Sequence, residues 1–141
     1  MSPGTIVGVV SCSGECCALG TVSRVATRLV LEDLRRSNTT TICLPLFLAG
    51  GEGERMFAKA YPTISVDGCG KECAKRAIEK YSNRTASSIV VEDLLENWGL
   101  AEPTSRRELD EDGLEAAKRV AEEIAATIDS ILLRGRRVER A

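Results

Sequence analysis

Short apolar runs alternate with amphipathic stretches along the first two thirds of the chain. Residues 5–10 form a β-branched apolar run, which is typical of a strand buried in a parallel sheet. From about residue 19 to residue 34 the apolar positions follow helical spacing. The same criteria predict strands at residues 39–46, 63–66 and 87–91, and helices at residues 52–60, 71–81 and 92–98.

This alternation predicts the fold class. Strands that take turns with helices are typical of βαβ units, in which parallel strands are joined by crossover helices. Asp67-Gly68 leads into a predicted helix and not into a second strand, so it is not a hairpin turn. We therefore expect an α/β fold with three layers: a mostly parallel sheet of about four strands, with helices on both faces.

The last third of the chain has a different pattern. Residues 1–98 form the predicted cysteine-rich α/β metal-binding domain, and the polar residues 99–108 follow as a linker. Residues 109–134 then predict a long amphipathic C-terminal helix with a heptad-like stripe. The stripe consists of Leu114, Ala117, Ala121, Ile124, Ile128 and Ile131. Two interpretations stay open: the stripe packs on the chain's own sheet, or it forms a homodimer.

Composition narrows the range of partners. The net charge is −2, the sequence pI is about 5.3 and aromatic residues make up 4%, which argues against a nucleic-acid surface. No run reaches the roughly 18 apolar residues of a membrane span. The first residues lack the basic start of a signal peptide. We therefore expect a cytoplasmic protein with no membrane or nucleic-acid partner, and any protein partner is unknown.

The candidate chemistry lies in the cysteines. All six occur between residues 12 and 73, and the chain contains no histidine. The absence of histidine excludes any mechanism that needs an imidazole as ligand or base. In a reducing compartment, clustered cysteines are more often metal ligands or catalytic groups than disulfides.

Three of the cysteines follow the order of the predicted strands. Cys12 comes just after the first strand, Cys43 lies late in the second, and Cys69 follows the third. Because the carboxyl ends of parallel strands share one edge of a sheet, these side chains are expected to meet there. Cys73 lies one helical turn beyond Cys69. Four thiolates suit tetrahedral Zn²⁺, and they equally suit an iron–sulfur cluster.

Other interpretations of these cysteines stay open. Cys43 lies inside an apolar strand and is also compatible with a small buried hydrophobic residue. Cys16 and Cys17 are either loop thiols or additional metal or redox groups. A cysteine such as Cys69 at a helix start is also suited to act as a nucleophile.

The chain resembles the DGC-domain family, proteins described as zinc-binding and named for an Asp-Gly-Cys motif. The motifs that carry the resemblance are Cys12-Ser13-Gly14, Cys43-Leu44 with Ala49-Gly50, and Asp67-Gly68-Cys69 with Cys73-Ala74. The resemblance covers about residues 5–82. It implies that Cys12, Cys43, Cys69 and Cys73 are the metal ligands, and it implies no particular reaction. Cys16 and Cys17 depart from the family pattern.

Two residues of the motif are expected to support the ligands. Asp67 is interpreted as a helix cap that accepts backbone N–H bonds, in preference to a direct ligand. Gly68 is expected to provide a backbone shape that bulkier residues do not adopt. The first functional hypothesis is a non-enzymatic zinc-binding protein that carries or senses the metal. The alternatives are a cysteine-based redox or sulfur-handling protein and an iron–sulfur protein.

Overall fold

A four-stranded parallel sheet forms the centre of the molecule. The computed structural model describes residues 5–140, with side chains as far as residue 135, so residues 1–4 of the predicted 1–98 domain lie outside the described residues. The strand order is β2-β1-β3-β4, and every pairing is parallel. The predicted α/β class is confirmed. The strands are β1 (Val7–Ser11), β2 (Thr39–Thr40), β3 (Thr63–Asp67) and β4 (Ser87–Val90).

The two central strands are buried on both faces. Val7 and Val9 of β1 and Ile64 and Val66 of β3 are each fully buried in one core. Val10 belongs to the second core, on the opposite face of the sheet. This double burial explains why the apolar run of β1 is nearly continuous rather than alternating.

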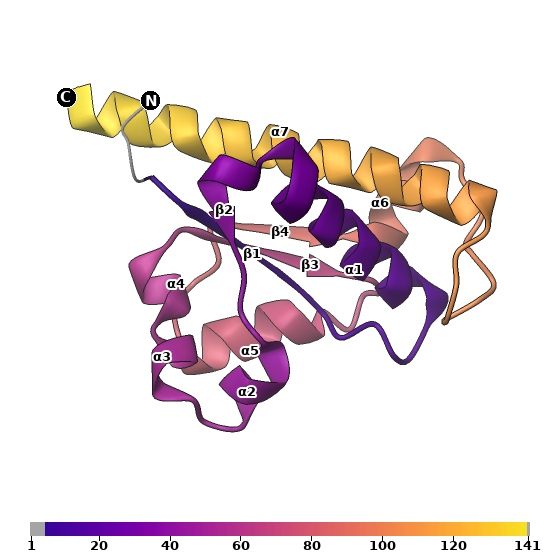
Figure 1. Cartoon of the computed structure of the whole chain (residues 1–141), viewed down its shortest axis with the longest axis horizontal. Helices are drawn as coiled ribbons and strands as arrows, with labels where there is room; N and C mark the ends of the chain where they lie inside the picture. The colour runs from indigo at the N-terminus through magenta and orange to yellow at the C-terminus, as the bar shows by residue number, and fades with distance from the viewer. Residues whose placement is uncertain (1–4, 141) are drawn as a thin grey trace.

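Helices cover both faces, as predicted (Figure 1). One face packs against α1, α6 and α7, which enclose the larger core with β1 and β3. The other face packs against α5 and the short helices that precede β3. The helices with at least eight residues are α1 (Ala18–Leu29), α5 (Cys73–Tyr81), α6 (Val91–Trp98) and α7 (Glu111–Arg140). The short ones are α2 (Leu44–Leu48), α3 (Glu52–Arg55) and α4 (Phe57–Ala60), and α1 continues as the π-helix η1 (Val30–Leu34) and the 3-10 helix η2 (Arg36–Asn38).

The C-terminal helix lies along α1 (Figure 1). Five residues of the predicted stripe are buried within the chain, namely Ala117, Ala121, Ile124, Ile128 and Ile131. Leu114, the sixth, is 45% exposed. A dimer formed through this stripe would therefore compete with packing inside the chain. The helix begins at Glu111 and passes through Gly135, because a single glycine costs a helix only about 1 kcal/mol.

The predicted second strand is wrong over most of its length. Only Thr39 and Thr40 pair with β1, and Leu44 begins the helix α2. Pro45 stands in the first turn of this helix, where a missing N–H costs nothing. Cys43 is therefore the residue before a helix and is exposed, so it is not a buried residue of a strand.

Two predicted helices also differ from the structure. The single helix expected at residues 52–60 is divided into α3 and α4 at Met56. The helix expected from Lys71 begins two residues later, at Cys73. Cys69 lies before it in a turn, in which the N–H of Glu72 donates to the Cys69 carbonyl. Cys69 and Cys73 are thus not separated by one turn of a single helix.

The polar segment before α7 contains no helix or strand from residue 99 to residue 110. The second half of this segment contacts the rest of the chain at two points. The hydroxyl of Thr21 donates to the carbonyl of Arg106 at 2.6 Å, and Leu109 is buried in the larger core. In the described part of the chain, no helix combines the length and the apolar character that crossing a bilayer requires.

Candidate metal centre

The carboxyl ends of β1 and β3 form a crevice. The connection after β1 leads into α1 on one face of the sheet, and the connection after β3 leads into α5 on the other. Neighbouring strands whose connections leave in opposite directions open a space between the two loops, which is where α/β folds bind ligands. A cavity of about 580 Å³ lies there.

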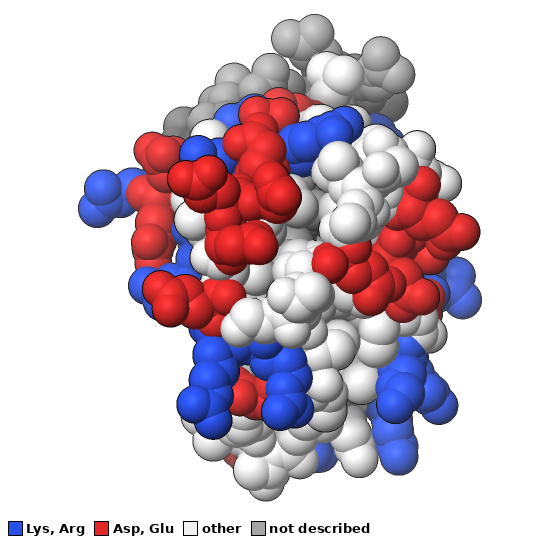
Figure 2. Space-filling model, turned by 90° about the vertical axis from the view of Figure 1, so that its right-hand side faces the viewer, with Lys and Arg blue, Asp and Glu red and all other residues white. Residues whose placement is uncertain are grey.

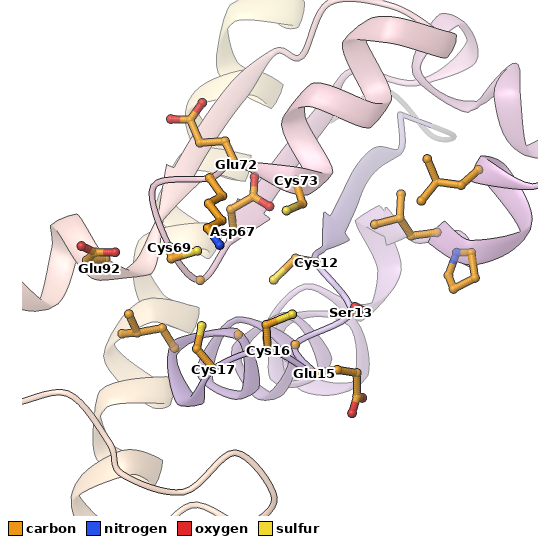
Figure 3. Close-up of a pocket in the computed structure, with 18 of the residues that line it drawn as sticks. Cys12, Ser13, Glu15, Cys16, Cys17, Asp67, Cys69, Glu72, Cys73 and Glu92 are labelled. Atoms are coloured by element: carbon orange, nitrogen blue, oxygen red, sulfur yellow. The ribbon is translucent and has the colours of Figure 1, made fainter.

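Five of the six cysteines line this cavity. Cys12, Cys16 and Cys17 belong to the first cysteine loop, residues 12–17, and Cys69 and Cys73 belong to the second cysteine loop, residues 68–73. Figure 3 shows their sulfur atoms directed into the space between the two loops. The predicted convergence of Cys12 and Cys69 at one edge of the sheet is thus what the structure shows. Leu19, Leu44, Pro45 and Leu48 provide much of the remaining wall.

Cys43 is the sixth cysteine and is not among the residues that line the cavity. It directly precedes α2, whose Leu44 and Leu48 form the apolar wall. Its side chain is exposed. The ligand role that the family pattern implies for Cys43 stays a prediction.

Three glycines bring the two cysteine loops together. The backbone of Gly68 packs against that of Gly20 in the first turn of α1, where a Cβ on Gly68 would lie 2.6 Å from the Cα of Gly20. A Cβ on Gly20 would in turn lie 2.6 Å from the Cα of Gly14. Gly14 also has a φ of +80°, which side chains rarely tolerate. Gly68 is therefore required by close packing, and not by an unusual backbone shape as predicted.

The first cysteine loop is attached to β3 and to α1. The backbone N–H of Cys12 donates to the carbonyl of Val66 at 3.0 Å. Arg24 of α1 donates to the carbonyl of Ser13 at 3.0 Å and to the carboxylate of Glu15 at 3.1 Å. The hydroxyl of Ser23 lies 3.3 Å from the sulfur of Cys12. These contacts hold Cys12 at the inner end of the loop, while Cys16 is exposed.

Asp67 attaches the second cysteine loop to α5. Its carboxylate is almost fully buried and accepts the N–H of Ala74 at 2.7 Å and that of Lys75 at 3.2 Å. The predicted capping role of Asp67 is confirmed. The cap fixes the helix turn on which Cys73 stands. Glu92 of α6 supports the same loop, accepting the N–H of Gly70 at 3.4 Å.

Burial and crowding oppose ionisation in this region. The side chain of Cys73 is exposed, yet the pKa of its thiol is raised, first by partial desolvation and then by the negative charges of Asp67 and the neighbouring cysteines. Burial also raises the pKa of Asp67, and its two backbone hydrogen bonds act in the opposite direction. The thiolates of this cluster repel one another, and a cation among them would remove that repulsion.

The mouth of the cavity is acidic. Figure 2 views the edge at which the strands end and shows acidic side chains on both sides of an uncharged hollow. Among the described residues that line the cavity, the charged ones at its rim are Glu15, Glu72, Glu92, Glu102 and Lys71. Glu15 pairs with Arg24 and Glu72 with Lys75, which leaves Glu92 and Glu102 to give the rim its excess of negative charge. Such a rim attracts cations and repels anions.

The donor set has the chemistry of a soft-metal site. Thiolates select zinc, Cu(I) and iron–sulfur clusters, whereas hard ions such as Mg²⁺ prefer oxygen ligands. Within the described residues, however, no group of three or more Cys, Asp or Glu side chains is already close enough to hold one metal ion. The residues fit such an ion in kind, and to hold one the thiols would have to move inward.

The chain matches one known protein family. A family model, the DGC domain, matches residues 8–124. The chain belongs to the DGC domain family. No curated protein and no solved structure matches it. The DGC match extends well beyond residue 82, where the resemblance in sequence motifs ends, and includes α6 and the first part of α7.

The DGC motif itself has a physical explanation in this fold. Asp67 caps α5, Gly68 makes the close contact with Gly20, and Cys69 lines the cavity. Sequence reasoning missed two residues of α1 that contribute to the same arrangement, Gly20 and Ser23. A glycine inside a predicted helix and a serine on its apolar side were the available signals.

Proposed function

We propose that this DGC-domain protein binds a thiophilic metal ion, Zn²⁺ in first place, in the cavity between its two cysteine loops. The observation that carries the proposal is that five cysteines from two distant segments line one cavity. Cys12, Cys69 and Cys73 are the principal ligands, and Cys16 or Cys17 is better placed than Cys43 to add a fourth. A tetrahedral zinc site has four ligands, with Zn–S distances of roughly 2.3 Å when the ligands are thiolates.

The acidic rim supports a metal cation over an anionic thiol substrate. A thiol enzyme needs a thiolate at neutral pH, which a lowered pKa provides. The pKa of the Cys73 thiol is instead raised, so Cys73 lacks the lowered pKa of an activated nucleophile. We therefore place metal carriage or sensing before sulfur chemistry.

An iron–sulfur cluster is the second candidate. The cavity of about 580 Å³ has room for more than a single ion, and cysteine thiolates are the usual ligands of such clusters. The cavity can equally contract around zinc if the thiols move inward. Metal identity is therefore the first property to measure.

The experiment is anaerobic purification followed by elemental analysis and visible absorption. The proposal predicts a colourless protein with about one zinc per chain. A brown protein with stoichiometric iron and sulfide would replace zinc with a cluster. A metal-free protein that does not take up Zn²⁺ and turns over a thiol substrate would refute metal binding altogether.

A further inference from the structure

Ser23 is a buried polar residue that the proposed ligand set does not include. It lies within α1 and has no exposed surface. Its neighbours on the helix, Val22 and Ala26, pack into the larger core. Its Oγ lies 3.3 Å from the sulfur of Cys12 and 2.7 Å from the carbonyl oxygen of Gly20. Serine is a weak helix former, and a fully buried one inside a helix calls for an explanation through its hydroxyl.

The hydroxyl of Ser23 has one proton for its two neighbours. It donates that proton to the carbonyl of Gly20, so the contact with Cys12 is one in which the sulfur donates. A sulfur that ligates a metal has no proton to donate. The contact then persists only if the Ser23 hydroxyl rotates away from Gly20 and donates to the sulfur. The Gly20 carbonyl still accepts a backbone N–H bond within the helix after this rotation, so the rotation costs little free energy.

Other buried hydroxyls in the same molecule do not have this relationship. Within the part of the chain that the structure describes, the Oγ of Ser65 and the Oγ1 of Thr27 are buried with no hydrogen-bond partner. Ser65 lies on β3 opposite Val10 of β1, the strand that ends at Ser11, directly before Cys12. A buried hydroxyl therefore does not in itself imply contact with a cysteine, and the geometry at Ser23 is specific.

We propose that Ser23 is a positioning residue for Cys12. Its hydroxyl fixes the direction of the Cys12 side chain toward the cavity and donates a hydrogen bond to that sulfur when the sulfur ligates a metal. Only the second of these roles, donation to a metal-bound sulfur, rests on the proposed function. Hydrogen bonds of this kind orient ligands and tune metal affinity, and losing one typically costs about 10- to 100-fold in affinity.

The test compares Ser23→Ala with Ser65→Ala, which removes a buried hydroxyl that has no partner. Zn²⁺ affinity is measured by competition with a chromophoric chelator, and the sulfur-to-metal absorption is recorded with Co²⁺. We expect Ser23→Ala to bind Zn²⁺ about tenfold more weakly with unchanged stoichiometry and a shifted Co²⁺ spectrum. Ser65→Ala should match the wild-type protein in both. Equal Zn²⁺ affinity and equal Co²⁺ spectra in all three proteins would overturn the proposal.

A measurement on metal-free protein separates this proposal from the proposed function. Side-chain NMR couplings of Cys12 should report one χ1 rotamer in wild-type protein and in Ser65→Ala, and averaging between rotamers in Ser23→Ala. If wild-type protein binds no metal but this difference is present, the metal proposal fails and the orienting role stands. If Cys12 has the same rotamer in all three proteins, the orienting role fails. Ser23→Thr, which keeps the hydroxyl, should restore the wild-type rotamer and affinity.

Discussion

Gly68 packs directly against the backbone of Gly20, and this contact joins the loop after β3 to the first turn of α1. Gly14 packs on the other side of the same turn. The glycines of two motifs therefore contact the same residue, Gly20, which neither motif contains. These motifs are Cys12-Ser13-Gly14 and Asp67-Gly68-Cys69. The two cysteine loops can approach each other because Gly14, Gly20 and Gly68 have no side chains.

The first prediction concerns Gly20→Ala. The added Cβ would lie 2.6 Å from the Cα of Gly14, and no side-chain rotation relieves a contact between backbones. We expect a loss of about 2 kcal/mol or more in the free energy of unfolding, measured by urea denaturation. Gly53→Ala is the matched control, because a Cβ on that helical glycine meets nothing within 4 Å. Equal stability of the two variants would contradict the packing argument.

The second prediction concerns the cap at Asp67. Asp67→Ala leaves the N–H groups of Ala74 and Lys75 without their carboxylate, and losing a cap costs about 1–2 kcal/mol. The first turn of α5 should loosen, and Zn²⁺ affinity should fall because Cys73 stands on that turn. Asp67→Asn keeps one acceptor oxygen and should lose less of both. A variant Asp67→Ala with wild-type stability and affinity would show that the cap does not position Cys73.

The third prediction concerns pH and the ion pair between Arg35, the residue that follows η1, and Asp129 of α7. Arg35 donates to both carboxylate oxygens of Asp129, at 2.9 and 2.7 Å, and these bonds lower the pKa of Asp129. The pair therefore stabilises the fold above about pH 4, the range of an unfolded aspartate, and the stabilisation is lost as pH falls through the lowered value. Because Asp129 is half exposed, we expect about 1 kcal/mol or less.

Asp129→Asn should accordingly be less stable than wild-type protein at pH 7, with the difference disappearing in acid. Glu32→Gln is the control, because Glu32 pairs with Arg28 within one helical segment and both side chains are more than 60% exposed. Its effect should be smaller. A stability difference for Asp129→Asn that does not change with pH would show that the ion pair is not its cause.

The fourth prediction separates Cys43 from the cavity cysteines. Cys43 lies outside the cavity lining, whereas Cys12, Cys69 and Cys73 line it. Saturating Zn²⁺ should protect these three from alkylation, as read by peptide mass spectrometry, and should leave Cys43 reactive. Protection of Cys43 together with the other three would show that α2 carries it into the site.

The fold was largely predictable because the strands are unusually clear. The β-branched runs of β1 and β3 are buried on both faces, so their apolar signal is strong. The predicted second strand is longer than the observed β2 because its threonines and isoleucine favour strands, whereas Pro45 favours the start of a helix. A proline in the first turn of a helix is a start signal, and here it determines the position of Cys43.

The candidate site was predictable in outline only. Strand order alone brought Cys12 and Cys69 to one edge of the sheet. The exclusion of Cys43 from the lining, the contact of Gly20 with two loops and the contact of Ser23 with Cys12 arise from the tertiary arrangement. The glycine and the serine inside the predicted helix mark Gly20 and Ser23 as unusual, but no local pattern specifies which residues they contact.

The central claim is that Cys12, Cys69 and Cys73 hold a metal ion in the cavity. The most direct test is Zn²⁺ titration of anaerobic, metal-free protein against a competing chelator, for the wild-type chain and its single Cys→Ser variants. We predict one tight site per chain in the wild-type protein, its loss in Cys12→Ser, Cys69→Ser and Cys73→Ser, and a milder effect of Cys17→Ser. Equal Zn²⁺ binding by all of these proteins would contradict the account.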